Sequence, residues 1–309
     1  MILNLELSVD HVVEAFEPIS HRFLCYADNL VVNDLWSALQ HACASCGWLK
    51  IDSKHFLSVR REDPTRGDAI DMAEYVHYDS PINGYLHVLV PEKLLVFNCP
   101  EDLPDGALWA DEGGERQFSA AYYADVFGDF GVEVVVRGCA DGVYDTAAFR
   151  ERGIEVEDLP LDDDAVPTLA EVDRFLAVVR YAPGAVAVHG GRGGLGAAGT
   201  LIASHLIGGH GFRAADAIAW VRLIHPAALP SAHQRFLRDN EARVRRHRLH
   251  SHSFAGRPAL DPAAIAAAAA PADPSDGPAA CELGLPRSIS APRIFDVLDG
   301  GVVGRASSA

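Results

Sequence analysis

The chain lacks a membrane-length apolar segment, an excess of basic charge and a cysteine framework. No apolar stretch reaches the roughly 18 residues that a transmembrane helix needs, and the first residues have no basic region followed by an apolar core, so no secretory signal is expected. The net charge of −17 argues against a nucleic-acid-binding protein, because such proteins carry a basic footprint. The six cysteines are scattered without framework spacing, which favours a reducing compartment. We therefore predict a cytoplasmic or nuclear protein with no membrane or nucleic-acid partner.

The middle of the chain alternates short β-rich runs with helical periodicity. The runs are bounded by Gly, Pro or Asp, and they lie at 94–97, 132–136, 154–159 and 185–189. Apolar residues recur on one helical face at Leu169, Val172, Leu176 and Val179, and again within 212–224. Strands that alternate with helices predict an α/β fold with a parallel-dominated sheet flanked by helices.

One segment, 185–203 (AVAVHGGRGGLGAAGTLIA), points to a binding function. A predicted strand runs into a glycine-rich loop, and a helix is expected to begin near Gly199. Free backbone N–H groups and the helix dipole converge on an anion in such an arrangement, so the segment predicts a phosphate-binding loop. The residues assigned to this loop are His189, Gly190, Arg192, Gly193, Gly194, Leu195, Gly196, Ala198, Gly199 and Thr200.

The motifs around this loop resemble the cell-division-cycle-fourteen type of dual-specificity, protein-tyrosine phosphatase. The matching segments keep their order and nearly all their spacings, and they are 187–189 (AVH), 194–196 (GLG), 199–203 (GTLIA), 217–222 (AIAWVR) and 233–237 (HQRFL). The resemblance covers about residues 71–240. It implies a protein-tyrosine phosphatase-like fold and an enzyme that forms a phosphocysteine intermediate.

The resemblance also identifies what the loop has lost. The family's nucleophilic cysteine falls at Gly191, and the loop arginine that grips the phosphoryl oxygens falls at Ala197. One extra residue stands between His189 and Thr200. Asp163 matches the family's general acid, and Gln234 matches a residue that positions water.

Each of these residues also has a simpler interpretation. Asp163 lies in a run of three aspartates, where a solvated loop acid is ordinary. His189 is expected to be a structural, hydrogen-bonding histidine even in an active relative. Arg192 could be a substitute phosphate ligand, but the position that it matches in the family faces outward. Gln234 lies on a helix-rich segment, where a surface role is common.

Two other patterns were weighed as sites. Residues 191–196 satisfy G-x-G-x-x-G, the dinucleotide fingerprint. That fingerprint requires a following strand that ends in an acidic residue, whereas the sequence has a helical pattern in that region. Cys43 and Cys46, with His41 nearby, have no second ligand pair, so helix-borne core cysteines are expected instead of a zinc site. We predict no metal and no cofactor.

The resemblance divides the chain into three parts. Residues 1–66, with one helical stripe at 33–44, are expected to be a truncated remnant of an N-terminal phosphatase-like domain, and 67–250 form the phosphatase-like domain. Residues 251–309, rich in Ala, Pro, Gly and Ser, are expected to be a disordered tail.

The prediction for function is a catalytically impaired phosphatase, a pseudophosphatase that binds phosphoproteins or other protein partners. The alternative is an active phosphoprotein phosphatase whose loop is misreported or works by unorthodox chemistry. An NAD-binding oxidoreductase is a distant third.

Overall fold

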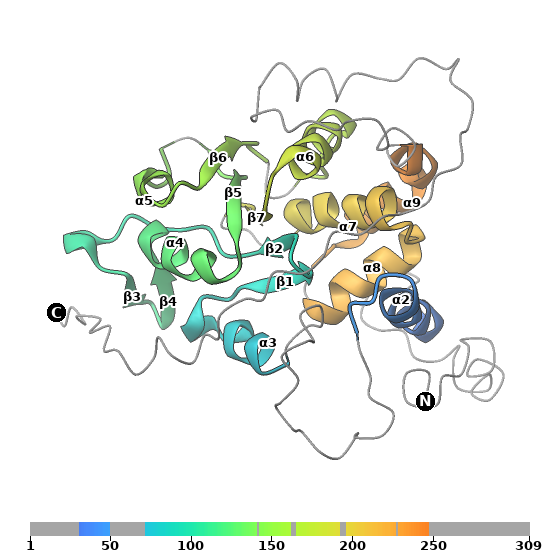
Figure 1. The fold of residues 1–309 in the computed structure, drawn as a ribbon, viewed down its shortest axis with the longest axis horizontal. Coiled ribbons are helices and arrows are strands. Elements are labelled where there is room, and N and C mark those ends of the chain that lie inside the picture. The colour runs from blue at the N-terminus through green and yellow to red at the C-terminus, as the bar shows by residue number, and fades with distance from the viewer. Residues whose placement is uncertain are drawn as a thin grey trace.

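The computed structural model describes residues 31–49, 72–140, 142–161, 165–191, 196–226 and 228–246 (Figure 1). Four predictions lie partly or wholly outside these ranges. They are the N-terminal remnant at 1–66, the C-terminal tail, the general-acid candidate Asp163 and the loop residues from Arg192 to Leu195.

A five-stranded sheet in the order β1-β2-β7-β5-β6 forms the centre of the fold. Its strands are β1 (His87–Val90), β2 (Leu94–Val96), β5 (Val132–Arg137), β6 (Glu155–Asp158) and β7 (Ala185–His189). β1 pairs with β2 antiparallel, whereas the β2–β7, β7–β5 and β5–β6 pairs are parallel. The predicted parallel-dominated sheet is confirmed, with β7 as its middle strand. A separate hairpin joins β3 (Trp109–Glu112) to β4 (Glu115–Phe118).

Helices flank this sheet. They are α2 (Val32–Ala44), α3 (Met72–Asp79), α4 (Ala120–Asp129), α5 (Ala147–Glu151), α6 (Leu169–Tyr181), α7 (Gly196–His210), α8 (Ala214–Ile224) and α9 (Ser231–Arg246), with single 3-10 turns η1 (Pro81–Asn83) and η2 (Pro104–Gly106). Two of these helices, α4 and α6, have side-chain caps at their N-termini. Ser119 accepts a hydrogen bond from the first turn of α4, and Thr168 with Glu171 forms a capping box at α6. None of the helices among the described residues has the length and apolarity to cross a bilayer.

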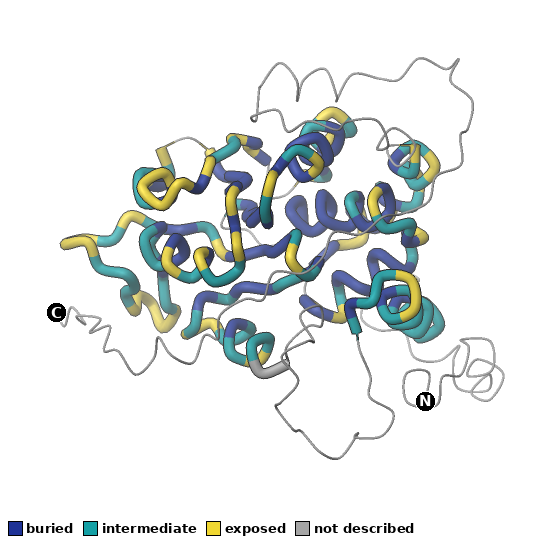
Figure 2. The backbone as a smooth tube through the Cα atoms, in the orientation of Figure 1, coloured by how far each residue is buried: buried dark blue, intermediate teal, exposed yellow. Residues whose placement is uncertain are grey.

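Helices cover the two faces of the sheet (Figure 1), and its strands are largely buried (Figure 2). The side chains on the two faces differ in kind. One face packs against α2 and α6 to α9, and its core is mostly aliphatic and alanine-rich. The other packs against α4, α5 and the β3–β4 hairpin, and it is rich in aromatic rings, among them Phe97, Tyr123, Phe127 and Phe149. Alternate residues of each strand point to opposite faces, as pleating requires: Val186 and Val188 enter the first core, whereas Ala185 and Ala187 enter the second.

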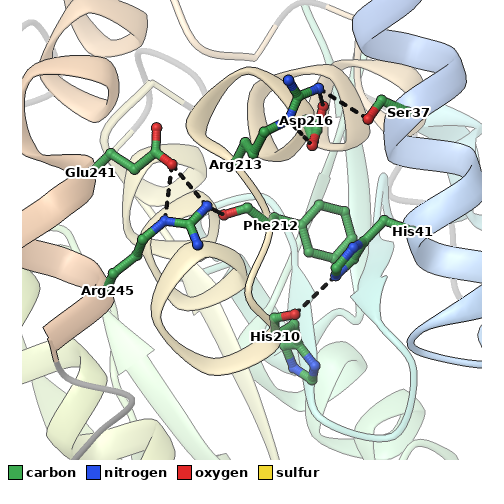
Figure 3. Close-up of polar contacts among 8 residues, drawn as sticks. All are labelled: Ser37, His41, His210, Phe212, Arg213, Asp216, Glu241 and Arg245. Atoms are coloured by element: carbon green, nitrogen blue, oxygen red, sulfur yellow. Dashed lines mark hydrogen bonds and ion pairs between the residues drawn. The ribbon is translucent and has the colours of Figure 1, made fainter. Parts of the chain in front are cut away.

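Helix α2 confirms the predicted helix at 33–44 and packs into the same core as α8. Ala38, Ala42 and Trp48 are buried there. Two side chains fasten it, as Figure 3 shows. His41 Nε2 lies 2.9 Å from the carbonyl oxygen of His210, and Arg213 donates to Ser37 Oγ at 3.0 Å. The boundary placed at residue 66 remains a prediction.

Candidate functional site

The connection from β7 to α7 leaves the sheet at the carboxyl end of its middle strand, where the sequence placed it. All five residues of β7 are buried, and so is Gly190. The ends of β2 and β5 lie on either side of β7. In parallel sheets the carboxyl end of the strands is where ligands bind, so this edge is the candidate site.

His189, the last residue of β7, is fully buried and held by two hydrogen bonds. Its Nδ1 lies 2.6 Å from the carbonyl oxygen of Gly190, and its Nε2 lies 2.9 Å from the hydroxyl of Tyr144. A carbonyl oxygen can only accept, so Nδ1 carries the proton and Nε2 accepts from Tyr144. Burial raises the pKa of Tyr144 far above its usual value, which keeps that hydroxyl a donor. The two hydrogen bonds fix the orientation of the His189 ring.

Helix α7 begins at Gly196, three residues before the predicted start at Gly199, because its first turn is closed by a side chain. Thr200 donates its hydroxyl to the carbonyl oxygen of Gly196 at 2.8 Å and accepts from Nδ1 of His233, also at 2.8 Å. A β-carbon on Gly196 would lie 3.0 Å from His233 Nε2. This position therefore favours glycine, and α9 holds the start of α7 in place.

Ala197, the position matched to the missing arginine, is 3% exposed in the first turn of α7. Ala198 beside it is fully buried. Both contribute only methyl groups to the core. The downstream side of the loop therefore offers backbone N–H groups and a helix N-terminus, but these two positions offer no cationic or nucleophilic side chain.

Gln234 is also fully buried, on α9. Its amide nitrogen donates to the carbonyl oxygen of Leu229 at 3.0 Å, and its oxygen accepts from Arg238 at 3.4 Å. Leu229 has a left-handed backbone, with φ of 60°, so the Gln234 amide supports a strained turn. Its proposed water-positioning role remains a prediction.

The segment that leads to Asp163 reaches the same edge of the sheet. The amide of Leu161 donates to the carbonyl oxygen of Gly138 at 2.8 Å, just beyond the end of β5. Asp163 itself and residues Arg192 to Leu195 lie outside the described residues, so their predicted roles stay predictions.

Sequence reasoning missed two cysteines at this edge. Cys99 follows β2, where the amide of Phe97 donates to the carbonyl oxygen of Val188 at 3.2 Å. Cys139 follows β5, where the amide of Gly138 donates to the carbonyl oxygen of His189 at 3.0 Å. The ligand atoms of Cys99, Cys139 and His189 all lie within 4.8 Å of one another. The available signal was that each cysteine comes two or three residues after a predicted strand of one parallel-dominated sheet.

The environment of Cys139 favours its thiolate. A hydrogen bond with Cys99 is the largest cause that lowers the pKa of Cys139, and the positive charge of Arg137 adds to it, against an opposing effect of burial. Arg137 is itself buried and donates to Asp158 at 2.5 Å. A thiolate is both a nucleophile and a soft metal ligand, so this edge carries chemistry that the glycine-rich loop does not.

Comparison with known proteins confirms the family resemblance. Residues 117–252 match a family model described as Swiss Army Knife protein, DSP-PTPase phosphatase domain. The chain is 34% identical over 170 residues to the human dual specificity protein phosphatase CDC14C, covering 55% of this chain and 36% of that protein. It is 33% identical over 175 residues to human CDC14A, covering 57% of this chain and 28% of that protein.

These curated relatives are longer than the part that matches, and the chain spans about a third of their length. Among solved structures, the chain is similar to Tk-PTP in its active form, with 22% identity, a TM-score of 0.40, and coverage of 51% of this chain and 97% of that one.

Proposed function

We propose that the protein is a pseudophosphatase. The proposal starts from the similarity of the chain to CDC14-type dual-specificity phosphatases. In this proposal it binds a phosphorylated protein partner at the β7–α7 loop without hydrolysing it. The same proposal places it in the cytosol or the nucleus. One observation carries it: the positions matched to the nucleophile and the arginine are Gly191 and the buried Ala197.

The missing groups perform separate steps of the family's reaction. A thiolate attacks phosphorus, an arginine stabilises the charge on the transferring oxygens, and an aspartic acid protonates the leaving group. Loss of a covalent nucleophile costs on the order of 10⁶ in rate, and loss of a phosphoryl-clamping arginine costs roughly 10³–10⁵. Asp163 does not compensate for either loss, because a proton donor without a nucleophile has no intermediate to form.

Binding depends on groups of another kind, and these are retained. The loop leaves a buried strand through Gly190 and Gly191 and ends at the start of α7, where Thr200 and His233 fix the first helical turn. Backbone N–H groups at a helix N-terminus attract an oxyanion. This arrangement supports recognition of a phosphate group by the loop amides, with weak affinity because no arginine assists.

The direct test measures hydrolysis and binding on the sequence-verified full chain. We expect no hydrolysis of an aryl phosphate or of a phosphopeptide above background. We expect a phosphopeptide to bind more tightly than its unphosphorylated counterpart in isothermal titration. Vanadate-sensitive turnover by the parent protein would overturn the proposal, and equal affinity for both peptides would remove its binding half.

A repaired variant tests whether the frame is otherwise that of a phosphatase. Gly190 is deleted, and Gly191→Cys and Ala197→Arg are introduced together. We expect turnover at least 10³-fold above the parent, and Asp163→Ala in the repaired protein should reduce it. The matched control deletes Gly190 alone, which corrects the loop length without supplying a nucleophile and should stay inactive.

A further inference from the structure

Three strands bring two thiols and an imidazole together at the carboxyl edge of the sheet. We call Cys99, Cys139 and His189 the thiol–imidazole cluster. The backbone enforces their proximity at Gly138, where a β-carbon would lie 2.2 Å from the carbonyl oxygen of His189. Real β-carbons do not approach that closely, so only glycine lets the end of β5 pass so near the end of β7. Cys139 is the next residue.

We propose that the thiol–imidazole cluster binds a zinc-class metal ion through Sγ of Cys99, Sγ of Cys139 and Nε2 of His189. Two thiolates and an imidazole form a ligand set that suits Zn²⁺. Zinc–sulfur bonds of about 2.3 Å allow two sulfurs on one ion to lie at most about 4.6 Å apart, and about 3.8 Å apart in a tetrahedron. The cluster, with its ligand atoms within 4.8 Å of one another, needs side-chain shifts of only about 1 Å to reach that geometry.

The protonation of His189 fits this role. Its Nδ1 donates to the carbonyl oxygen of Gly190, which leaves the lone pair on Nε2. Metal-bound histidines typically donate their other ring nitrogen in this way, and the bond fixes both tautomer and orientation. The hydroxyl of Tyr144, which now donates to Nε2 at 2.9 Å, must turn aside when the ion binds.

Both thiols are free, and one of them is partly exposed to solvent. Cys99 and Cys139 are not joined in a disulfide, and Cys99 is half-exposed, so an ion in solution can reach the cluster. The Sγ atom of Cys99 lies 3.6 Å from the carbonyl oxygen of Pro100, to which the thiol donates.

Three protein ligands leave one coordination position open. Closed four-ligand sites are structural, whereas three ligands plus a water or a substrate oxygen are typical of reactive zinc. This open position would lie at the sheet edge from which the β7–α7 loop departs. The metal site does not depend on phosphoprotein binding, so either proposal can fail without the other.

The experiment titrates the reduced, metal-stripped full chain with Co²⁺ as a spectroscopic substitute for Zn²⁺. We expect one equivalent to bind, with a sulfur-to-cobalt charge-transfer band and the strong visible bands of tetrahedral cobalt. One equivalent of Zn²⁺ should displace them. Zn²⁺ should also raise the Tm of the protein, because a ligand that binds only the folded state stabilises it.

Variants locate the site. Cys99→Ser and Cys139→Ser should each weaken Zn²⁺ binding by at least roughly 10–100-fold and weaken the charge-transfer band. Circular dichroism of the metal-free variants checks that they fold. The matched control, Cys43→Ser, replaces a half-exposed thiol on α2 and should leave binding unchanged.

Two results would overturn the proposal. One is the absence of cobalt–sulfur bands in the reduced parent. The other is unchanged affinity in both folded cluster variants, which would place the metal elsewhere. A Cys99–Cys139 disulfide in protein purified without reductant would remove both thiolate ligands, so the titration is run before and after reduction, and binding is expected only in the reduced protein.

Discussion

Two regions of this molecule each contain two cysteines and a histidine, and only one of them forms a cluster. Cys43, Cys46 and His41 are neighbours in sequence, on and just after α2. Cys99, Cys139 and His189 are separated by 40 and 50 residues, yet their ligand atoms lie within 4.8 Å of one another. Within the described residues, this second group is the one whose geometry could hold a metal.

The difference shows how a helix and a parallel sheet use sequence spacing. On α2 the side chain of His41 is directed to another task, because its Nε2 contacts the carbonyl oxygen of His210 and its ring packs edge-on against Phe212 (Figure 3). In the sheet, residues that follow different strands meet because the strands end together. Proximity in sequence is therefore a poor guide to a ligand set here, and position after a strand is a better one.

The largest loss of stability and of Zn²⁺ affinity is expected from Gly138→Ala, at the thiol–imidazole cluster. Its β-carbon would lie 2.2 Å from a backbone oxygen, which cannot rotate away, so β5 and β7 must separate. We expect the free energy of unfolding to fall by about 3 kcal/mol and Zn²⁺ affinity to fall at least tenfold, measured by urea denaturation and cobalt titration. The matched control is Gly128→Ala on α4, where the new β-carbon has nothing within 4 Å and a change of less than about 1 kcal/mol is expected. Equal effects at the two glycines would contradict the role given to Gly138.

The next effect concerns a second histidine group that tertiary structure assembles. His87 and His225 are buried, and their ring centroids are 4.8 Å apart. The carboxylate of the half-exposed Asp79 lies beside them, with its Oδ1 3.4 Å from His87 Nε2, and the ring nitrogens make no hydrogen bond. Burial, with the charge of His225, lowers the pKa of His87 to about 3, and burial also lowers the pKa of His225. The folded protein therefore binds fewer protons than the unfolded chain below pH 6.5, so stability should fall as the pH falls.

The expected slope is up to about 1.4 kcal/mol per pH unit for each histidine, measured by denaturation between pH 7 and pH 5. His87→Phe should flatten this slope and leave Zn²⁺ binding at pH 7 unchanged. His77→Phe on α3 serves as the control that keeps the slope. A change of Zn²⁺ affinity in His87→Phe would show that the His87–His225 pair and the thiol–imidazole cluster are not independent.

A smaller effect is expected where α2 docks. His41→Ala removes the hydrogen bond to His210 and the edge contact with Phe212, whose ring centroid is 4.3 Å away. We expect a loss of about 1–3 kcal/mol in the free energy of unfolding, because the His210 carbonyl loses its partner, with no change in Zn²⁺ affinity. Ser37→Ala, which removes only an exposed contact with Arg213 (Figure 3), should cost less than about 1 kcal/mol. Weakened metal binding in His41→Ala would show that the α2 group takes part after all.

The smallest effect is expected from Thr200→Ser, near the start of α7. Thr200→Ser keeps the hydroxyl that links Gly196 to His233, and we expect a change of less than about 1 kcal/mol. Thr200→Val keeps the shape but strands the Nδ1 proton of His233 in the core, at a cost of roughly 1–3 kcal/mol. Urea denaturation of the pair measures the difference. Neither variant should alter Zn²⁺ affinity, because Thr200 lies in α7 and is not one of the proposed metal ligands.

Much of the fold was predictable from the sequence, for reasons that particular elements show. The run at 185–189 became β7 without a change of boundary, and the stripe at 33–44 became α2. The first is a short apolar run that is buried along its whole length, and the second places apolar residues at helical spacing. Helix α7 was predicted to begin near Gly199 and begins at Gly196, within a glycine-rich stretch whose local pattern marks no sharp boundary.

The sequence by itself determined the resemblance to dual-specificity phosphatases, the alternation of strands and helices, and the prediction that Gly191 and Ala197 stand at the nucleophile and arginine positions. These properties reside in residue types and local spacing. Only the tertiary structure decided which strands are neighbours, and hence that Cys99 and Cys139 meet His189. The physical reason is that strand order arises from the packing of the whole sheet, and no local pattern encodes which strand ends will share an edge.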